Sequence, residues 1–211
     1  YLYITYNIGL AFMLRGIYIL FLFSNFLFTE SKVFASDGNS GDNFGKSVSI
    51  YNNWFAVGAN KDDDNGQNSG SVYLYKYDDM DIVEEYKILP ADGDYNEYFG
   101  KTLSLSDEWL IVSSIYDDEN GEKSGSVYVY KYDGEDWIEF VKIFPGDGSP
   151  YDRFGYSLDL HGNKMIIGSV YDDDYGENSG SAYIYSFDGN NWNLEQKINS
   201  DFQQQEAHFG R

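Results

Sequence analysis

Residues 44–60 read "FGKSVSIYNNWFAVGAN", and the pattern returns as "FGKTLSLSDEWLIVSSI" at 99–115 and "FGYSLDLHGNKMIIGSV" at 154–170. A fourth Phe-Gly pair follows at 209–210. The four Phe residues are spaced by 55 positions (99 − 44, 154 − 99 and 209 − 154). A gap-free period of this length, built from short strand-like segments, predicts a repeat architecture such as a β-propeller or a β-array.

Each period contains four strand-like segments, which in the first copy are residues 45–51, 54–59, 70–77 and 82–89. A short turn joins the first and second segments, Asn-Asn at 52–53, and another joins the third and fourth, which in later copies contains the Asp-Gly pairs of "YDGEDW" and "FDGNNW". An acidic loop lies between the second and third segments. Asp-Gly is a strong hairpin signal, and connections this short favour antiparallel neighbours. The sequence therefore predicts sheets of four antiparallel strands.

The third segment of each copy is bulky on both faces. In the first copy Val72 and Leu74 alternate with Tyr73, Tyr75 and Tyr77, and successive side chains of a strand point to opposite faces. A sheet with one face in water would carry polar residues there, so each sheet needs neighbours on both sides. Radially packed propeller blades meet that need. We expect an all-β partial propeller of about three full blades (about 44–98, 99–153 and 154–208) and the start of a fourth.

These motifs resemble the FG-GAP repeat family, whose best-known members are the N-terminal propellers of integrin α subunits. The resemblance covers residues 36–211, and the Asp-rich turn followed by "SGSVYLY" is most similar to FG-GAP repeats of secreted microbial proteins. The family usually closes seven blades, so the resemblance implies further blades of the same protein, or further copies, as neighbours. We interpret the Phe-Gly pairs as structural, because Gly lets the backbone approach a neighbouring blade and Phe fills the core. The pairs are Phe44, Gly45, Phe99, Gly100, Phe154, Gly155, Phe209 and Gly210.

The composition restricts the partners. The 211 residues include 35 Asp and Glu against 14 Lys and Arg, a net charge of −21, which makes nucleic acid a poor partner and favours cations or basic surfaces. Disordered acidic chains lack aromatic residues, whereas this chain contains 21 Tyr and should fold. The absence of Cys means that no disulfide holds the fold together.

The first 35 residues are strongly apolar and predict a signal peptide. A basic residue, Arg15, precedes the apolar run 16–28, and Val33 and Ala35 suit the −3 and −1 positions of a cleavage site after Ala35. The mature chain, 36–211, would then have no membrane span and would be secreted or held at the cell surface. The alternative is an uncleaved anchor, which would bury Arg15 in the bilayer at a high cost.

Three Asp-rich turns, "KDDDNGQNSG", "YDDENGEKSG" and "YDDDYGENSG", begin at residues 61, 116 and 171. Calcium prefers several carboxylate and carbonyl oxygens on a flexible loop. The first and third acids of each turn are therefore candidate Ca²⁺ ligands: Asp62, Asp64, Asp117, Glu119, Asp172 and Asp174. The alternative, which we favour, is a solvated turn, because Asp, Asn, Gly and Ser stabilise turns by local hydrogen bonds. In integrin-type repeats the calcium motif lies one connection earlier, so the resemblance does not carry calcium over to these turns.

A second acidic loop joins consecutive blades and places Asp37, Asp92 and Asp147 in one phase of the repeat, where we interpret them as turn residues. No catalytic arrangement stands out: Cys is absent, and the two His have no repeat partners. No phosphate-binding loop, dinucleotide fingerprint or zinc spacing occurs either. We therefore expect an extracellular binding or adhesion module, not an enzyme, with a protein or glycan partner. The alternatives are a purely structural repeat domain of a larger surface protein, or a fragment of a propeller hydrolase or lyase whose active site lies in other blades.

Overall fold

The computed structural model describes residues 13–14, 17–18, 32–78, 81–200 and 205–211. The chain divides into two units, 1–32 and 33–211. In the first unit the described residues form two short antiparallel strands, β1 (Met13–Leu14) and β2 (Ile17–Tyr18). Most of the expected signal peptide lies outside the described residues, so it stays a prediction. No helix in the described ranges has the length and apolar character needed to cross a membrane.

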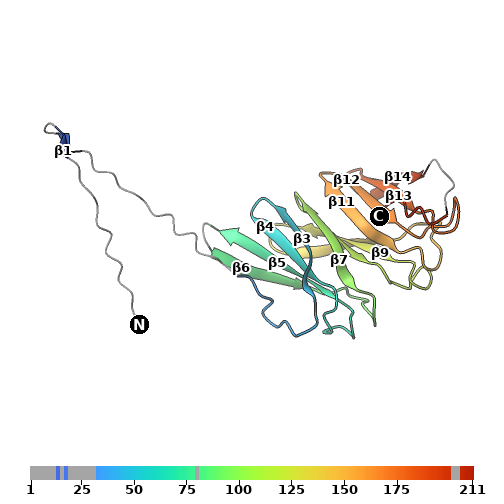
Figure 1. The fold of residues 1–211 in the computed structure, drawn as a ribbon, viewed down its shortest axis with the longest axis horizontal. Coiled ribbons are helices and arrows are strands. Elements are labelled where there is room, and N and C mark those ends of the chain that lie inside the picture. Colours follow the sequence, from blue (N-terminus) through green and yellow to red (C-terminus); the bar gives the residue numbers. More distant parts are fainter. Residues whose placement is uncertain (1–12, 15–16, 19–31, 79–80, 201–204) are drawn as a thin grey trace. The chain divides into compact units, whose positions relative to one another are not determined.

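The second unit consists of three sheets, each of four antiparallel strands in chain order, and Figure 1 shows them side by side. We call them blades 1, 2 and 3. Blade 1 contains β3 (Phe44–Tyr51), β4 (Trp54–Ala59), β5 (Ser71–Asp78) and β6 (Asp81–Ile88). Blade 2 contains β7 (Phe99–Ser106), β8 (Trp109–Ser114), β9 (Ser126–Tyr132) and β10 (Trp137–Ile143). Blade 3 contains β11 (Phe154–His161), β12 (Lys164–Ser169), β13 (Ser181–Phe187) and β14 (Trp192–Asn199). The all-β, four-stranded blades expected from the sequence are confirmed.

The hairpin between the first two strands of each blade is set by its turn residues. In blade 1, Tyr51 pairs with Trp54 across the two-residue turn, and Asn52 has a φ of 51°. Two-residue hairpin turns need positive φ values, which Asn, Asp and Gly adopt most easily. Asp107 and Gly162 take the same place in the other blades, with φ values of 48° and 56°.

Neighbouring blades bury their apolar faces against each other. Val72 and Leu74 pack with Leu105 and Tyr128 of blade 2, while Val129 lies on the opposite face of blade 2, in the layer shared with blade 3.

Tryptophans pack in the same two layers between blades. Trp54 contacts Trp137 with ring centroids 5.9 Å apart, and Trp109 contacts Trp192 with ring centroids 5.4 Å apart. Blade 2 is therefore covered on both sides, as the alternation of its third strand predicts.

The Phe-Gly pairs are sites of close backbone approach between blades. The Ser47 hydroxyl donates a hydrogen bond to the carbonyl of Gly100 at 2.8 Å, and a Cβ added to Gly58 would lie 2.2 Å from that carbonyl oxygen. The fourth pair repeats the contact, because Ser157 Oγ donates to the Gly210 carbonyl at 2.6 Å. Residues 209–210 thus take the place on blade 3 that residues 99–100 take on blade 1.

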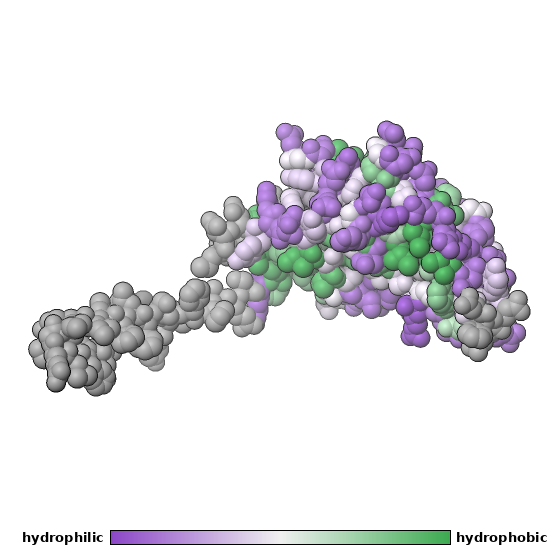
Figure 2. Space-filling view, turned by 90° about the horizontal axis from the view of Figure 1, so that it is seen from above, coloured by the Kyte–Doolittle hydropathy of each residue, from purple (hydrophilic) through white to green (hydrophobic). Residues whose placement is uncertain are grey.

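Equivalent strand positions differ in exposure according to what covers them. Leu103 and Leu105 of β7 are 7% and 5% exposed, whereas Val48 and Ile50 of β3 are 69% and 72% exposed. Among the described residues no further blade packs on this part of β3. Figure 2 shows hydrophilic residues along the edges of the described surface and hydrophobic residues gathered between them.

Candidate functional site

The first acid of each Asp-rich turn points into the blade. Asp62 is 2% exposed; its Oδ1 accepts the backbone N–H of Asp64 at 3.0 Å, and its Oδ2 accepts the hydroxyl of Ser71 at 2.9 Å. In blade 2 the Asp117 carboxylate accepts the equivalent bonds. The local hydrogen bonds of a well-formed turn are therefore present, as the turn hypothesis requires.

The middle acids of the turns have a different role. The carboxylates of Asp63, Asp118 and Asp173 each accept the backbone N–H five residues further on, at 2.7, 2.5 and 2.6 Å. The three N–H donors belong to Asn68, Lys123 and Asn178. All three donor residues have positive φ values, so these bonds hold the turn in an unfavourable backbone conformation.

A lysine from the fourth strand lies among the turn carboxylates. In blade 1, Lys87 Nζ is 3.1 Å from Asp62 Oδ2, 2.5 Å from Asp64 Oδ2 and 2.7 Å from Asp37 Oδ2. Asp37 comes from the loop that precedes the blade, so one ammonium group ties together two acidic loops that are separate in the sequence. We call this arrangement of one lysine and three carboxylates a lysine–carboxylate cluster.

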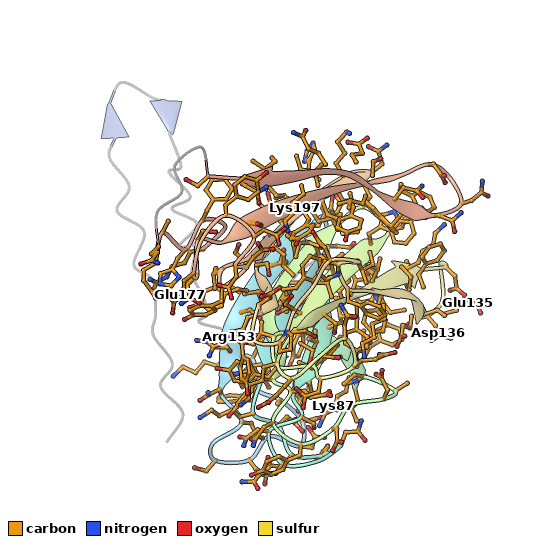
Figure 3. All side chains as sticks on the ribbon, turned by 90° about the vertical axis from the view of Figure 1, so that its right-hand side faces the viewer. Lys87, Glu135, Asp136, Arg153, Glu177 and Lys197 are labelled. Carbon is orange, nitrogen blue, oxygen red and sulfur yellow. The ribbon has the colours of Figure 1, made fainter. Side chains whose placement is uncertain are left out.

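The lysine–carboxylate cluster occurs in every blade, and Figure 3 labels Lys87 and Lys197 of the first and third. In blade 2, Lys142 Nζ lies 2.6, 2.7 and 2.7 Å from carboxylate oxygens of Asp117, Asp92 and Glu119. In blade 3, Lys197 Nζ lies 2.8, 2.8 and 2.5 Å from those of Asp172, Asp147 and Asp174. The three occurrences at a 55-residue period show that the lysine–carboxylate cluster is a property of the repeat.

A tyrosine from the third strand completes each lysine–carboxylate cluster. The Tyr73 hydroxyl lies 2.7 Å from Asp37 Oδ1 and 2.9 Å from Asp62 Oδ2. Lys87 Nζ lies 5.1 Å from the centroid of the Tyr73 ring, within the range of a cation–π contact. Tyr128 and Tyr183 hold the same places in the other blades, with the lysine nitrogen 5.0 Å from each ring.

The electrostatic interactions within the lysine–carboxylate clusters favour the charged forms of the lysine and of the carboxylates. Burial alone would lower the pKa of Lys142, but its hydrogen bonds to Asp117, Asp92 and Glu119 outweigh burial and raise that pKa above its ordinary value. The hydrogen bond from Lys87 is the main cause that lowers the pKa of Asp37. A buried charge is tolerated when it is paired and hydrogen-bonded, and here the ammonium donates to carboxylates on several sides.

The position of the lysine among the turn carboxylates affects whether the turns can bind calcium. The structure brings each predicted pair together, Asp62 with Asp64 and their equivalents, but the space among the carboxylates holds an ammonium group. Calcium needs six to eight oxygen ligands around one centre. Among the described residues, no three or more His, Cys, Asp or Glu side chains are arranged to hold a metal ion. The loops do not fit a Ca²⁺ ion while the lysine keeps this position.

Sequence reasoning did not identify the lysines as members of this site. Lys87, Lys142 and Lys197 recur with the 55-residue period of the Phe-Gly pairs, and that recurrence was the available signal. Asp37 and its equivalents were interpreted only as turn residues. Their second role depends on the fourth strand reaching back to the loop before the blade, which no local pattern reveals.

The blades, the Phe-Gly contacts and the repeated lysine–carboxylate clusters define a repeat protein of the β-propeller class. The chain belongs to the FG-GAP repeat family, whose repeat matches residues 28–75, 82–130 and 137–185. The second and third matches begin in or at the last strand of one blade and end in the third strand of the next, so they span blade boundaries. No curated protein matches the chain in sequence.

Proposed function

We propose that this FG-GAP chain is an extracellular recognition module, which presents loops on a rigid propeller-type scaffold to a protein or glycan at a cell surface. The observation that carries the proposal is a set of exposed tyrosines on loops that are held in place. Tyr95, Tyr151 and Tyr175 are 60%, 47% and 45% exposed. Exposed aromatic side chains are favoured anchors in recognition because they bury large area at a small entropic cost.

The loops that carry these tyrosines are fixed by several contacts. Tyr95 and Tyr151 lie in the loops between blades, whose acids Asp92 and Asp147 bind the lysines of the clusters. Tyr175 lies in the Asp-rich turn of blade 3, which is closed by the hydrogen bond from the backbone N–H of Asn178 to the Asp173 carboxylate. A loop that is ordered before binding loses less conformational entropy when a partner docks. This arrangement supports recognition by a preformed surface.

The test is binding of the labelled full chain to glycan microarrays and to intact cells. The variant combines Tyr95→Ser, Tyr151→Ser and Tyr175→Ser, which removes the exposed rings and leaves the loop carboxylates in place. We expect loss of most binding, since truncation of an aromatic anchor commonly costs about 2 kcal/mol or more.

The matched control is Tyr77→Ser. Tyr77 is 47% exposed near the opposite end of β5 from the Asp-rich turn, so its removal should leave binding unchanged. Wild-type protein that binds no array and no cell would support the purely structural alternative. Equal losses in the triple variant and in the control would contradict the loop surface as the contact site.

Calcium stabilisation stays a separate prediction that a melting experiment decides. The calcium hypothesis predicts that millimolar Ca²⁺ raises the melting temperature and that Asp62→Ala with Asp64→Ala reduces the effect. The lysine–carboxylate clusters predict no rise for the wild type, because the ammonium groups hold the carboxylates. Mg²⁺ at equal concentration controls for general ionic effects.

A further inference from the structure

A second group of lysines gathers in a hollow of ≈ 220 Å³ lined in part by Lys46, Lys61 and Lys101. Asn43 and Asn60 also line it, and the Asn43 amide donates a hydrogen bond to Asn60 Oδ1 at 3.4 Å. The chain has a net charge of −21, so surface lysines have many carboxylates available as partners. Three cations around one hollow therefore need an explanation.

The fold forces these lysines together. Lys46 and Lys101 hold the same place in two repeats, directly after the Phe-Gly pairs of β3 and β7, and the contact between Ser47 and Gly100 brings those strand starts together. The backbone N–H of Lys61, just beyond β4, donates to the carbonyl of Asp42 at 3.1 Å. The positions of the lysines thus follow from backbone contacts and blade packing.

A fourth cation, Arg153, lies beside the lining residue Tyr116. The guanidinium carbon of Arg153 is 4.9 Å from the ring centroid of Tyr116 and 4.5 Å from that of Tyr171. Its Nε is buried and has no hydrogen-bond acceptor among the described residues. Figure 3 labels Arg153 within the body of the blades. A buried donor without an acceptor is costly in a folded protein.

The four cations around the hollow have no close carboxylate partner in the part of the chain that the structure describes. Among the described residues, neither Arg153 nor any of the three lysines of the hollow has an ion pair within 4.0 Å. The acids closest to these residues in the sequence have other partners: Asp62, which follows Lys61, pairs with Lys87. The carboxylates of Glu97, Asp42 and Asp152 accept backbone N–H groups of their own loops. Burial and the charges of Lys46, Arg153 and Lys61 together lower the pKa of Lys101.

We propose that this hollow, lined by Lys46, Lys61 and Lys101, binds a tetrahedral oxyanion, either free or as a sulfate or phosphate ester on a small molecule. Three ammonium groups and two amides supply N–H donors in several directions, which suits an anion with several acceptor oxygens. The hollow is several times larger than the ~30 Å³ share of a water molecule in the liquid. A nucleic acid does not suit it, because the overall negative charge repels a long polyanion.

The test is calorimetric titration of the full chain with inorganic sulfate and inorganic phosphate at constant ionic strength. Glucose 6-sulfate and glucose 6-phosphate follow, and the tighter of the two esters identifies the source of the oxyanion. We expect saturable binding that Lys101→Gln and Lys46→Gln each weaken by about tenfold or more, since each removes a charged donor.

The matched control is Lys76→Gln, which removes the same charge from a lysine that stacks on Trp54 outside the hollow. We expect it to leave oxyanion binding within about twofold of wild type, because a distant surface charge is screened. The proposal is overturned if none of the four anions binds, if chloride competes equally well, or if the control loses as much affinity as Lys101→Gln. The tyrosine variants of the recognition surface leave this hollow intact, so the two proposals fail independently.

Discussion

Two groups of lysines in this protein experience opposite electrostatic surroundings. Lys87, Lys142 and Lys197 each contact three carboxylates, whereas Lys46 and Lys101 share a hollow with other cations. The first group lies on fourth strands and the second on first strands. The strand on which a lysine lies therefore decides whether carboxylates of the blade surround it or other cations do.

Removal of a lysine that is paired with carboxylates should have the largest effect on stability. In Lys142→Met the carboxylate of Asp117, 2% exposed, would be left buried without its cation. Breaking one partner of a buried ion pair costs about 3–5 kcal/mol, so we expect a loss of that order in the free energy of unfolding measured with urea. Lys164→Met, which removes an exposed pair with Glu195, is the control and should cost at most about 1 kcal/mol. A loss below about 1 kcal/mol in Lys142→Met would show that the cluster is not an important source of stability.

Removal of the same lysine should also create a calcium site. In Lys142→Ala the carboxylates of Asp92, Asp117 and Glu119 keep their places without the ammonium, and such hard oxygen ligands suit Ca²⁺. Millimolar Ca²⁺ should restore part of the lost melting temperature, by an amount equivalent to about 1–3 kcal/mol, and should leave the wild type unchanged. Equal responses of variant and wild type would contradict the view that the lysine replaces a cation.

The dependence of stability on pH distinguishes buried carboxylates without a lysine partner from the carboxylates of the lysine–carboxylate clusters. Burial raises the pKa of Glu97 and of Asp152 to about 7. A pKa raised by folding gives stability that is full below the unfolded value and is lost as the pH rises through about 7. The hydrogen bond from Lys87 lowers the pKa of Asp37, so that contribution is instead lost as the pH falls below the unfolded value.

We therefore expect the free energy of unfolding to decrease by about 1–3 kcal/mol between about pH 5 and about pH 8. Glu97→Gln with Asp152→Asn should flatten this decrease, since neither replacement ionises. Urea titrations at the two pH values provide the measurement. A slope that persists in the double variant would assign the effect to other groups.

The smallest expected effect comes from the unpaired lysines. Lys101→Met removes one of several neighbouring positive charges, so it should raise the melting temperature in chloride buffer by the equivalent of at most about 1 kcal/mol. Sulfate should narrow the difference, because a bound oxyanion stabilises the wild type. Lys76→Met is the control and should show no rise. A destabilised Lys101→Met protein would indicate that the lysine stem contributes packing instead.

Much of the fold could be predicted from local pattern. The four strands of blade 1 lie within one residue of the expected segments, and Asn52 adopts the positive φ that a tight turn requires. The site was only half predictable. Asp62 and Asp64 do come together, but the group between them is Lys87, which lies 23 residues beyond Asp64 on the fourth strand.

The sequence alone determined the repeat unit, its four strands and the two bulky faces, because hydrophobic alternation and turn chemistry act over a few neighbouring residues. Which charged groups meet depends on how the strands and the blades pack. Antiparallel strand order carries Lys87 back to two loops at one end of the blade, while packing between blades brings Lys46 and Lys101 together. Electrostatic interactions depend on distance in space, and a local sequence pattern does not fix the distances between residues that lie far apart in the chain.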